Sequence, residues 1–280
     1  MKKMKRVLLG VVLLWGAGGV AQAQTPQTPV VSPAPAVKTI PPLDNVPEVP
    51  VPPQDPVLDW TYAGGNGPSR WATIRPPYHA CGNGRKQSPV NIAKFYQDDL
   101  PPLDLTYHAV PLSLINTGRT VLLPYPDGSG FMADGLFYAL RQIVFHTPSE
   151  HYIDGAPYPV EVQLIHRADD GTQAIVSVMM KVGKNNPVLA GILQNVPVQT
   201  FAQKTVPTVK YSARGLMPQT LEHYRYEGSL TVPPCSEGVI WFVMKTPLEI
   251  SEEQIRAFQG LFPVNARPIQ PLNDRVITGD

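Results

Sequence analysis

From residue 59 to its end, the chain is divided into short apolar runs by glycine, proline and asparagine. Runs of this kind, rich in β-branched and aromatic residues, are typical of half-buried strands. Strands are predicted at residues 112–123, 137–146, 160–166, 174–182, 230–232 and 239–245. One helix is predicted at 251–261, because Ser251 can cap it and Glu252 and Glu253 lie in its first turn. The predicted fold class is therefore mainly β with short helices (α+β), in a single domain spanning residues 59–280.

Residues 1–23 have the pattern of a secretory signal peptide. A basic start (Lys2, Lys3, Lys5 and Arg6) precedes an apolar run at 7–20, and a small-x-small cleavage site ends at Ala23. The apolar run is too short to span a bilayer comfortably, although an uncleaved anchor is the alternative. No later segment is apolar enough for a membrane helix. We expect a periplasmic or secreted protein.

Residues 24–58 contain eleven prolines in 35 positions. A segment of this composition cannot bury a core, and it is expected to form an extended spacer of the polyproline-II type. It serves either as a passive tether or as a strand that docks on a partner.

The charge of the chain argues against one class of partner. Removing the signal peptide removes four basic residues and no acidic one, so the formal net charge falls by four, from +1 to −3. Binding to a phosphate backbone requires a basic surface. We therefore expect no nucleic acid partner.

Cys81 and Cys235 are the two cysteines of the chain. In an exported protein, two cysteines are most simply interpreted as one disulfide. Two buried free thiols are the alternative.

A series of motifs follows in order between residues 60 and 277. They are Trp60-Thr61-Tyr62, Gly67-Pro68 with Trp71, Gln87-Ser88-Pro89-Val90-Asn91-Ile92, Pro148-Ser149-Glu150-His151, Tyr226-x-Gly228-Ser229-Leu230-Thr231-Val232-Pro233-Pro234-Cys235-x-Glu237, Asn265-x-Arg267-Pro268 and Gln270-Pro271-Leu272-Asn273-x-Arg275. Together they resemble the α-class carbonic anhydrases. The resemblance implies one domain built on a large twisted, mostly antiparallel central sheet. It also implies a bridge between the two cysteines, which bacterial members commonly have.

The resemblance fails at the metal ligands. In the family, zinc is held by both histidines of a Gln-x-His-x-His segment and the first histidine of a Glu-x-His-x-x-His segment. The corresponding positions here are Val144, His146 and Gln163. Catalytic zinc takes three protein ligands, valine has no donor atom, and an amide oxygen suits harder cations. No cofactor is therefore expected, and zinc would be expected only if the metal site were atypical.

Other residues of the family's catalytic network are present. The resemblance assigns to Thr231 the role of orienting a zinc-bound hydroxide, to Glu150 that of receiving the threonine's proton, and to Tyr62 a place beside them. Gln142 and Glu161 match hydrogen-bond partners of the first and third ligands. Without the ligands, none of these residues is expected to be catalytically competent, and they are interpreted as a vestige that still specifies the core.

The remaining basic side chains do not restore a metal site. Arg119 takes the place of the histidine that shuttles protons in the fastest family members, and it is expected to add positive charge near the cavity mouth. His166 is expected in the core, and His151, which follows Glu150, is expected to face away from it. The other histidines, in loop-like sequence, are His79, His108 and His223.

Three functions are compatible with these observations. The first is an exported, non-catalytic module that binds or supports a protein partner in the cell envelope. The second is a zinc-dependent carbonic anhydrase, hydrating carbon dioxide to bicarbonate with an atypical metal site. The third is a metal-free protein that binds a small ligand in a retained cavity.

Overall fold

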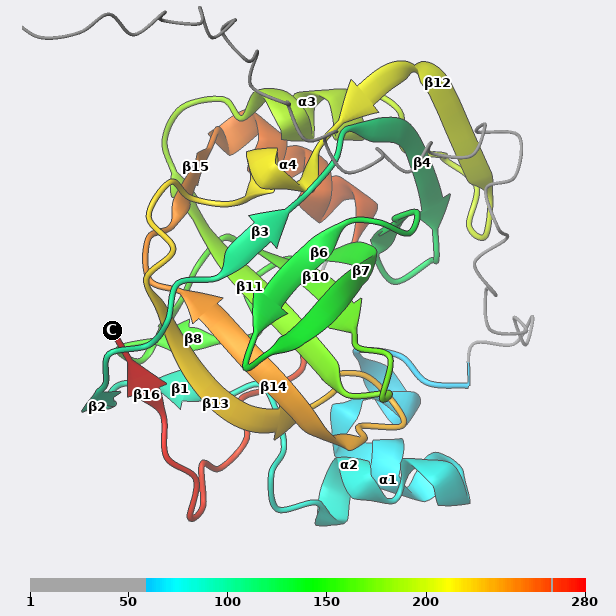
Figure 1. The fold of residues 1–280 in the computed structure, drawn as a ribbon. Helices are drawn as coiled ribbons and strands as arrows, with labels where there is room; N and C mark the ends of the chain where they lie inside the picture. Colours follow the sequence, from blue (N-terminus) through cyan, green and yellow to red (C-terminus); the bar gives the residue numbers. More distant parts are fainter. Residues whose placement is uncertain (1–58, 263) are drawn as a thin grey trace, which may run out of the picture. The chain divides into compact units, whose positions relative to one another are not determined.

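The computed structural model describes residues 59–262 and 264–280 (Figure 1). The predicted signal peptide (1–23) and proline-rich segment (24–58) lie outside the described residues. Within residues 59–262 and 264–280, no helix is both long and apolar enough to cross a membrane.

In the described part of the chain, a sheet of 13 strands forms the framework. Its main path runs through β12 (Gln203–Tyr211), β4 (Val110–Asn116), β5 (Val121–Pro124), β7 (Leu136–His146), β10 (Val160–Arg167), β11 (Gln173–Val182), β14 (Glu237–Met244), β13 (His223–Ser229), β16 (Thr278–Gly279) and β2 (Tyr96–Gln97). Off this path, β15 (Leu248–Ile250) pairs with β11, and β6 (Gly130–Ala133) pairs with β7 and with β3 (Asp104–Thr106). A smaller sheet contains β1 (Asn91–Ile92), β8 (Tyr152–Ile153) and β9 (Ala156–Pro157).

Most neighbours in the large sheet are antiparallel. The exceptions are β14 and β15, which both run parallel to β11, and β2, which runs parallel to β16. The sheet is visibly twisted in Figure 1, as a long sheet of L-residues is expected to be. The predicted fold class and the large, mostly antiparallel central sheet are confirmed.

The helices are short. They are α1 (Trp71–Ile74), α2 (Ala80–Asn83), α3 (Pro187–Leu193), α4 (Glu252–Leu261) and the 3-10 helices η2 (Gly64–Asn66), η3 (Pro68–Arg70), η4 (Pro76–Tyr78) and η5 (Ala213–Leu216). The predicted helix is α4, and Ser251 caps it in a capping box with Gln254.

Two strand predictions were wrong. Residues 112–123 form two strands, β4 and β5, because the chain turns between them at Gly118, which has a φ of 74°. The side chain of Asn116 accepts a hydrogen bond from Gly118 and stabilises that turn. Residues 230–232 form no strand, since β13 already ends at Ser229 and Pro233 and Pro234 have no N–H to continue a ladder.

The strands that carry the candidate site bury both of their faces. On β11, Val176 and Val178 belong to a large apolar cluster on one face, while Ile175 and Met179 belong to a second cluster on the other. Because side chains alternate along a strand, polar residues with the parity of Ile175 lie on the second face. The candidate site therefore lies on this second face of the sheet.

Candidate functional site

Val144, His146 and Gln163, which stand where the resembling family has its three metal ligands, lie together on one face of the sheet. On β7, Ile143 and Phe145 belong to the large apolar cluster, so the intervening Val144 and His146 point to the opposite face. On β10, Gln163 is the register partner of Val144, and Glu161 is the register partner of His146. All four side chains are buried. The structure thus brings Val144, His146 and Gln163 together on one face of the sheet.

The amide group of Gln163 joins two buried carboxylates. Its Nε2 donates to Glu150 Oε2 at 2.8 Å and to Glu161 Oε1 at 3.0 Å. Only the NH₂ end of an amide can donate, so two carboxylate neighbours fix which end faces them. Gln163 therefore acts as a hydrogen-bond donor between two acidic groups.

Glu161 is the most heavily hydrogen-bonded of these groups. Its Oε2 accepts from the backbone N–H groups of Glu150 and His151 at 2.8 and 2.9 Å. Its Oε1 lies 2.9 Å from His151 Nδ1 and accepts from Ser177 Oγ at 2.8 Å, in addition to Gln163. Burial by itself raises the pKa of Glu161, but the His151 imidazole, the hydrogen bonds and His146 outweigh it and lower the pKa to about 2. Glu161 is thus held as a carboxylate.

The C-terminal segment of the domain supplies a further hydrogen bond to the Glu150 carboxylate. Its Oε1 accepts from the backbone N–H of Arg267 at 2.9 Å. The buried guanidinium group of Arg267 donates to the backbone carbonyls of Ser88 and Cys81, both at 2.7 Å. Burial lowers the pKa of Arg267 to about 10, against the attraction of Glu150 and Tyr62, so it remains a cation near neutral pH.

The shortest hydrogen bond of His146 is to Asn265, not to Val144 or Gln163. Its Nδ1 lies 2.7 Å from the backbone carbonyl of Asn265, so Nδ1 carries the proton and donates. The other ring nitrogen, Nε2, lies 3.5 Å from Glu150 Oε2. The lone imidazole therefore faces a carboxylate that Gln163 already engages.

The network expected around Thr231 differs from the one observed. Among the described residues, no hydrogen bond joins the Thr231 hydroxyl to Glu150, whose two carboxylate oxygens accept from Gln163 and Arg267. The Gln142 side chain likewise has no hydrogen-bond partner among the described residues. Tyr62 does lie near the network, since its pKa is raised well above its usual value by burial and then by the Glu150 carboxylate.

Arg119 packs against the start of the domain. Its guanidinium carbon lies 3.6 Å above the Trp60 ring, and its Nη2 donates to the Trp60 carbonyl at 2.8 Å. Partial burial lowers its pKa. The predicted positive charge at this position is therefore stacked on an aromatic ring, a favourable arrangement for arginine.

Two of the other histidines, His151 and His223, were placed wrongly by sequence reasoning. His151 does not face away from the network, because its imidazole lies between Glu161 and the hydroxyl of Tyr226, 2.6 Å from its Nε2. His166 is in the core as predicted, 2.9 Å from the Tyr107 hydroxyl, and burial lowers its pKa to about 3. His79 and His108 are exposed, whereas His223, expected in a loop, is buried at the start of β13.

Four participants were not identified as such from the sequence. They are Ser177, Tyr226, Asn265 and Arg267. A signal existed for Ser177, which is the one polar residue between Ala174 and Met180, inside an apolar run. Tyr226, Asn265 and Arg267 lie within recognised motifs, but their partners depend on tertiary contacts.

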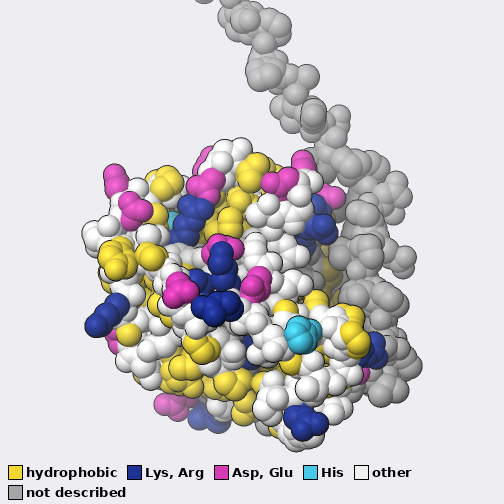
Figure 2. Space-filling view, turned by 90° about the horizontal axis from the view of Figure 1, so that it is seen from below, with side chains coloured by type: hydrophobic (Ala, Val, Ile, Leu, Met, Phe, Trp, Pro, Cys, Tyr) yellow, Lys and Arg dark blue, Asp and Glu magenta, His cyan; other side chains and the backbone are white. Residues whose placement is uncertain are grey.

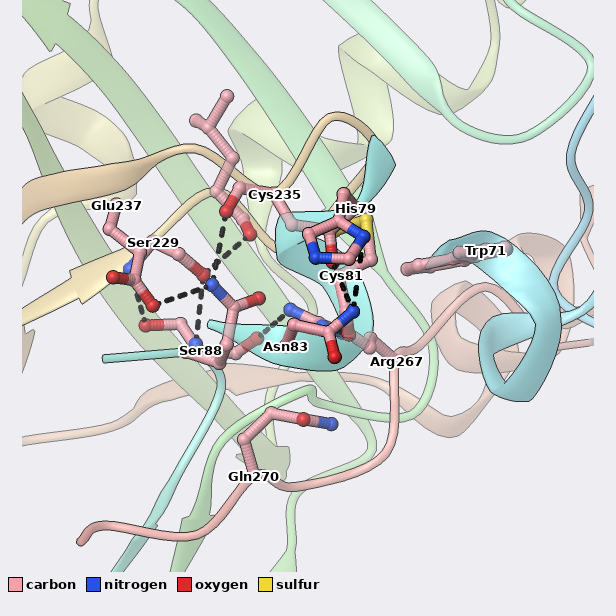
Figure 3. Close-up of a disulfide and its surroundings, with 12 residues drawn as sticks. Trp71, His79, Cys81, Asn83, Ser88, Ser229, Cys235, Glu237, Arg267 and Gln270 are labelled. Atoms are coloured by element: carbon pink, nitrogen blue, oxygen red, sulfur yellow. Dashed lines mark hydrogen bonds between the residues drawn. A yellow bond between two sulfur atoms is a disulfide. The ribbon is translucent and has the colours of Figure 1, made fainter. Parts of the chain in front are cut away.

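A disulfide joins Cys81 to Cys235, and their Cα atoms are 5.0 Å apart. The predicted bridge is confirmed. Figure 3 shows it beside Arg267 and Trp71, and the sulfur atoms belong to a small cluster that also contains Trp60. The bridge therefore attaches the N-terminal helices to the loop that holds Thr231.

Thiol counting tests this bridge directly. The denatured, unreduced protein is expected to show no reactive thiol, because both cysteines are oxidised. The same protein after reduction should show two, which serves as its own control. Two thiols before reduction would contradict the bridge.

Comparison with known proteins identifies the family. Residues 66–279 match the family model described as eukaryotic-type carbonic anhydrase. The chain belongs to this family.

Bacterial carbonic anhydrases are among its relatives. The carbonic anhydrase of Pectobacterium atrosepticum is 37% identical over 221 residues, which cover 79% of this chain and 90% of the relative. The α-carbonic anhydrase of Thermovibrio ammonificans, solved in complex with the inhibitor sulfanilamide, is 36% identical. Its TM-score is 0.76, with 78% of this chain and 98% of that chain covered.

Dioscorin is also similar to this chain. A solved structure of dioscorin complexed with ascorbate has a TM-score of 0.73 and 30% identity, covering 79% of this chain and 97% of that chain.

The residues at the carbonic anhydrase metal position do not fit zinc. Val144 has no donor atom, and the nitrogen of Gln163 is engaged with two carboxylates. Only His146 offers an imidazole, and one histidine falls short of the three protein ligands of a catalytic zinc. Within residues 59–262 and 264–280, no three His, Cys, Asp or Glu side chains are grouped as a metal site.

Proposed function

We propose that this chain is a metal-free member of the carbonic anhydrase family that does not hydrate carbon dioxide. One observation carries the proposal: Gln163, at the third ligand position, donates to both Glu150 and Glu161. Hydration at neutral pH requires a hydroxide, which zinc supplies by lowering the pKa of its bound water to about 7. Without three ligands there is no hydroxide for Thr231 to orient.

The role that fits such a protein is that of a binding or structural module. The disulfide and the bacterial relatives favour an extracellular or periplasmic location. Residues 1–23 are proposed as a signal peptide and residues 24–58 as the arm that tethers the domain or docks on a protein of the cell envelope. Figure 2 shows basic and acidic side chains intermingled on one face. Exposed ion pairs such as Arg85–Asp274 and Lys86–Glu227 likewise balance positive charge with negative charge, which supports a protein partner over nucleic acid.

A zinc-dependent carbonic anhydrase with an atypical site is the second candidate. The observation in its favour is that the relatives from Pectobacterium and Thermovibrio are named carbonic anhydrases. Binding of a small ligand in a retained cavity stays a prediction. Two pockets of the described residues, one beside α3 and β12 and one beside β15, are not lined by Val144, His146 or Gln163.

Metal analysis and activity separate these candidates. Purified protein loaded with zinc and dialysed is expected to retain no stoichiometric metal, and carbon dioxide hydration should equal the uncatalysed rate. A chelator should leave the melting temperature unchanged, because the apolar core and the disulfide stabilise the fold without metal.

The matched variant for this test is His146→Ala. Under the proposal it changes stability but not hydration, which is already at background. Zinc-dependent hydration that His146→Ala abolishes would establish the second candidate instead.

A further inference from the structure

The hairpin of β6 and β7, near the centre of Figure 1, turns one of its two faces to solvent. Phe131 and Tyr138 are register partners, stack on each other and are buried in the large apolar cluster. Because side chains alternate along a strand, the next pair of register partners, Met132 and Phe137, points the opposite way. Their exposed fractions are 39% and 41%, so a thioether and an aromatic ring share this exposed hairpin face.

Met132 differs from the other methionines of the described residues. Met179, Met180, Met217 and Met244 are all buried, with exposed fractions between 0% and 4%. A dissolved oxidant reaches a buried thioether only after a local opening of the structure, and that opening costs free energy. Within residues 59–262 and 264–280, Met132 is therefore the one methionine that an oxidant can reach in the folded state.

No thiol competes with this thioether. A cysteine thiolate would be the first target of a peroxide, but Cys81 and Cys235 are the two cysteines of the chain and they are joined in the disulfide. Both are also buried, so the disulfide itself is shielded. The oxidisable sulfur that is most readily reached in the described domain is thus that of Met132.

We propose that Met132 is a site of reversible modification, at which hydrogen peroxide or an organic hydroperoxide forms methionine sulfoxide. In this step a lone pair of the sulfur attacks one peroxide oxygen, and the O–O bond breaks. That oxygen stays bonded to the sulfur, which is oxidised by two electrons, while the peroxide is reduced to water or to an alcohol. Methionine sulfoxide is a product that dedicated reductases convert back to methionine. The site is independent of the function proposed above.

The modification changes the exposed hairpin face and leaves the core in place. A sulfoxide is polar, so the pair of Met132 and Phe137 loses one of its two apolar members. Phe131 and Tyr138 keep their stacking on the buried side of the hairpin, and β6 stays paired with both β3 and β7 through its backbone. Oxidation therefore alters what this face can contact in solution without unfolding the domain.

Peptide mapping by mass spectrometry after treatment of the full chain with hydrogen peroxide tests the site. In the folded protein, Met132 should gain one oxygen atom at least about tenfold faster than any of the four buried methionines, because an opening that costs only about 1.4 kcal/mol already slows a buried site by that factor. In urea the five rates should converge. The proposal is overturned if Met132 reacts no faster than the buried four when folded, or if its advantage persists unchanged in urea.

Retention on a hydrophobic-interaction column tests the effect on the surface. The peroxide-treated protein should elute earlier than the untreated one, and Met132→Gln, which is polar without oxidation, should elute early before any treatment. Met132→Leu keeps an apolar side chain of similar volume and has no sulfur, so the peroxide-dependent shift should be lost. Met244→Leu, at a buried position, is the matched control and should keep the shift. If Met132→Leu leaves the shift unchanged, the modified site lies elsewhere and the proposal fails.

Discussion

Replacing Glu161 with leucine is expected to lower the free energy of unfolding by about 4 kcal/mol or more, because it leaves several buried donors without an acceptor. The donors are two backbone N–H groups and the side chains of His151, Gln163 and Ser177. A loss of this size is a large fraction of the whole stability of a typical domain, about 5–15 kcal/mol. Urea unfolding of the variant and the parent measures it.

The matched control is Glu222→Leu. Glu222 is exposed and its side chain has no hydrogen bond among the described residues. Its replacement should change stability by no more than about 0.5 kcal/mol. If the two variants were equally stable, Glu161 would not be the centre of the network.

The conservative variant Glu161→Gln tests the charge separately. In the folded state the pKa of Glu161 is lowered from its ordinary 4.5 to about 2. The ionised group therefore contributes stability that is fully present above pH 4.5 and is lost as the pH falls towards 2. The variant should be less stable at pH 7 and should lose less stability on acidification. Parallel pH profiles for the two proteins would contradict the assignment.

Restoring histidine at both missing ligand positions is expected to create a zinc site. Val144 and Gln163 are register partners on β7 and β10, and both share a face with His146, so three imidazoles would converge. Glu161 lies beside position 163, where it can accept a hydrogen bond from the new ring. Val144→His/Gln163→His should retain one zinc per chain after dialysis.

Each single variant is the control for the pair. Two ligands are one short of the three in a catalytic site, so neither single variant should match the affinity of the double. Hydration by the double variant should be measurable but slow, because the Arg119 guanidinium stays protonated at neutral pH and cannot release and take up a proton as an imidazole does. A folded double variant that binds no zinc would show that the site has changed beyond these two positions.

The strands that carry this site could be predicted from the sequence, but most of the hydrogen bonds between its side chains could not. Strand alternation placed Val144 and His146 on one face, since that depends only on local periodicity, whereas the place of Gln163 on the neighbouring strand came from the family resemblance. The partners of Gln163 were not foreseeable, because they depend on how the loop with Glu150 approaches β10. His151 was misplaced for the same reason: it precedes β8 in a turn, where alternation no longer applies. The hairpin between β4 and β5 was missed because one glycine reverses an otherwise continuous apolar run.

If the chain is metal-free as proposed, the hydrogen bonds of Gln163 to Glu150 and Glu161 also bear on how readily single substitutions could restore a metal site. A change of Gln163 to histidine removes the donor shared by Glu150 and Glu161 while Val144 still supplies no ligand. A change of Val144 to histidine first buries a second imidazole beside His146 with no metal to hold it. Under the proposed function, both routes to a metal site pass through an intermediate that loses buried packing or hydrogen bonds before it can hold a metal. Selection for stability would then disfavour either first step.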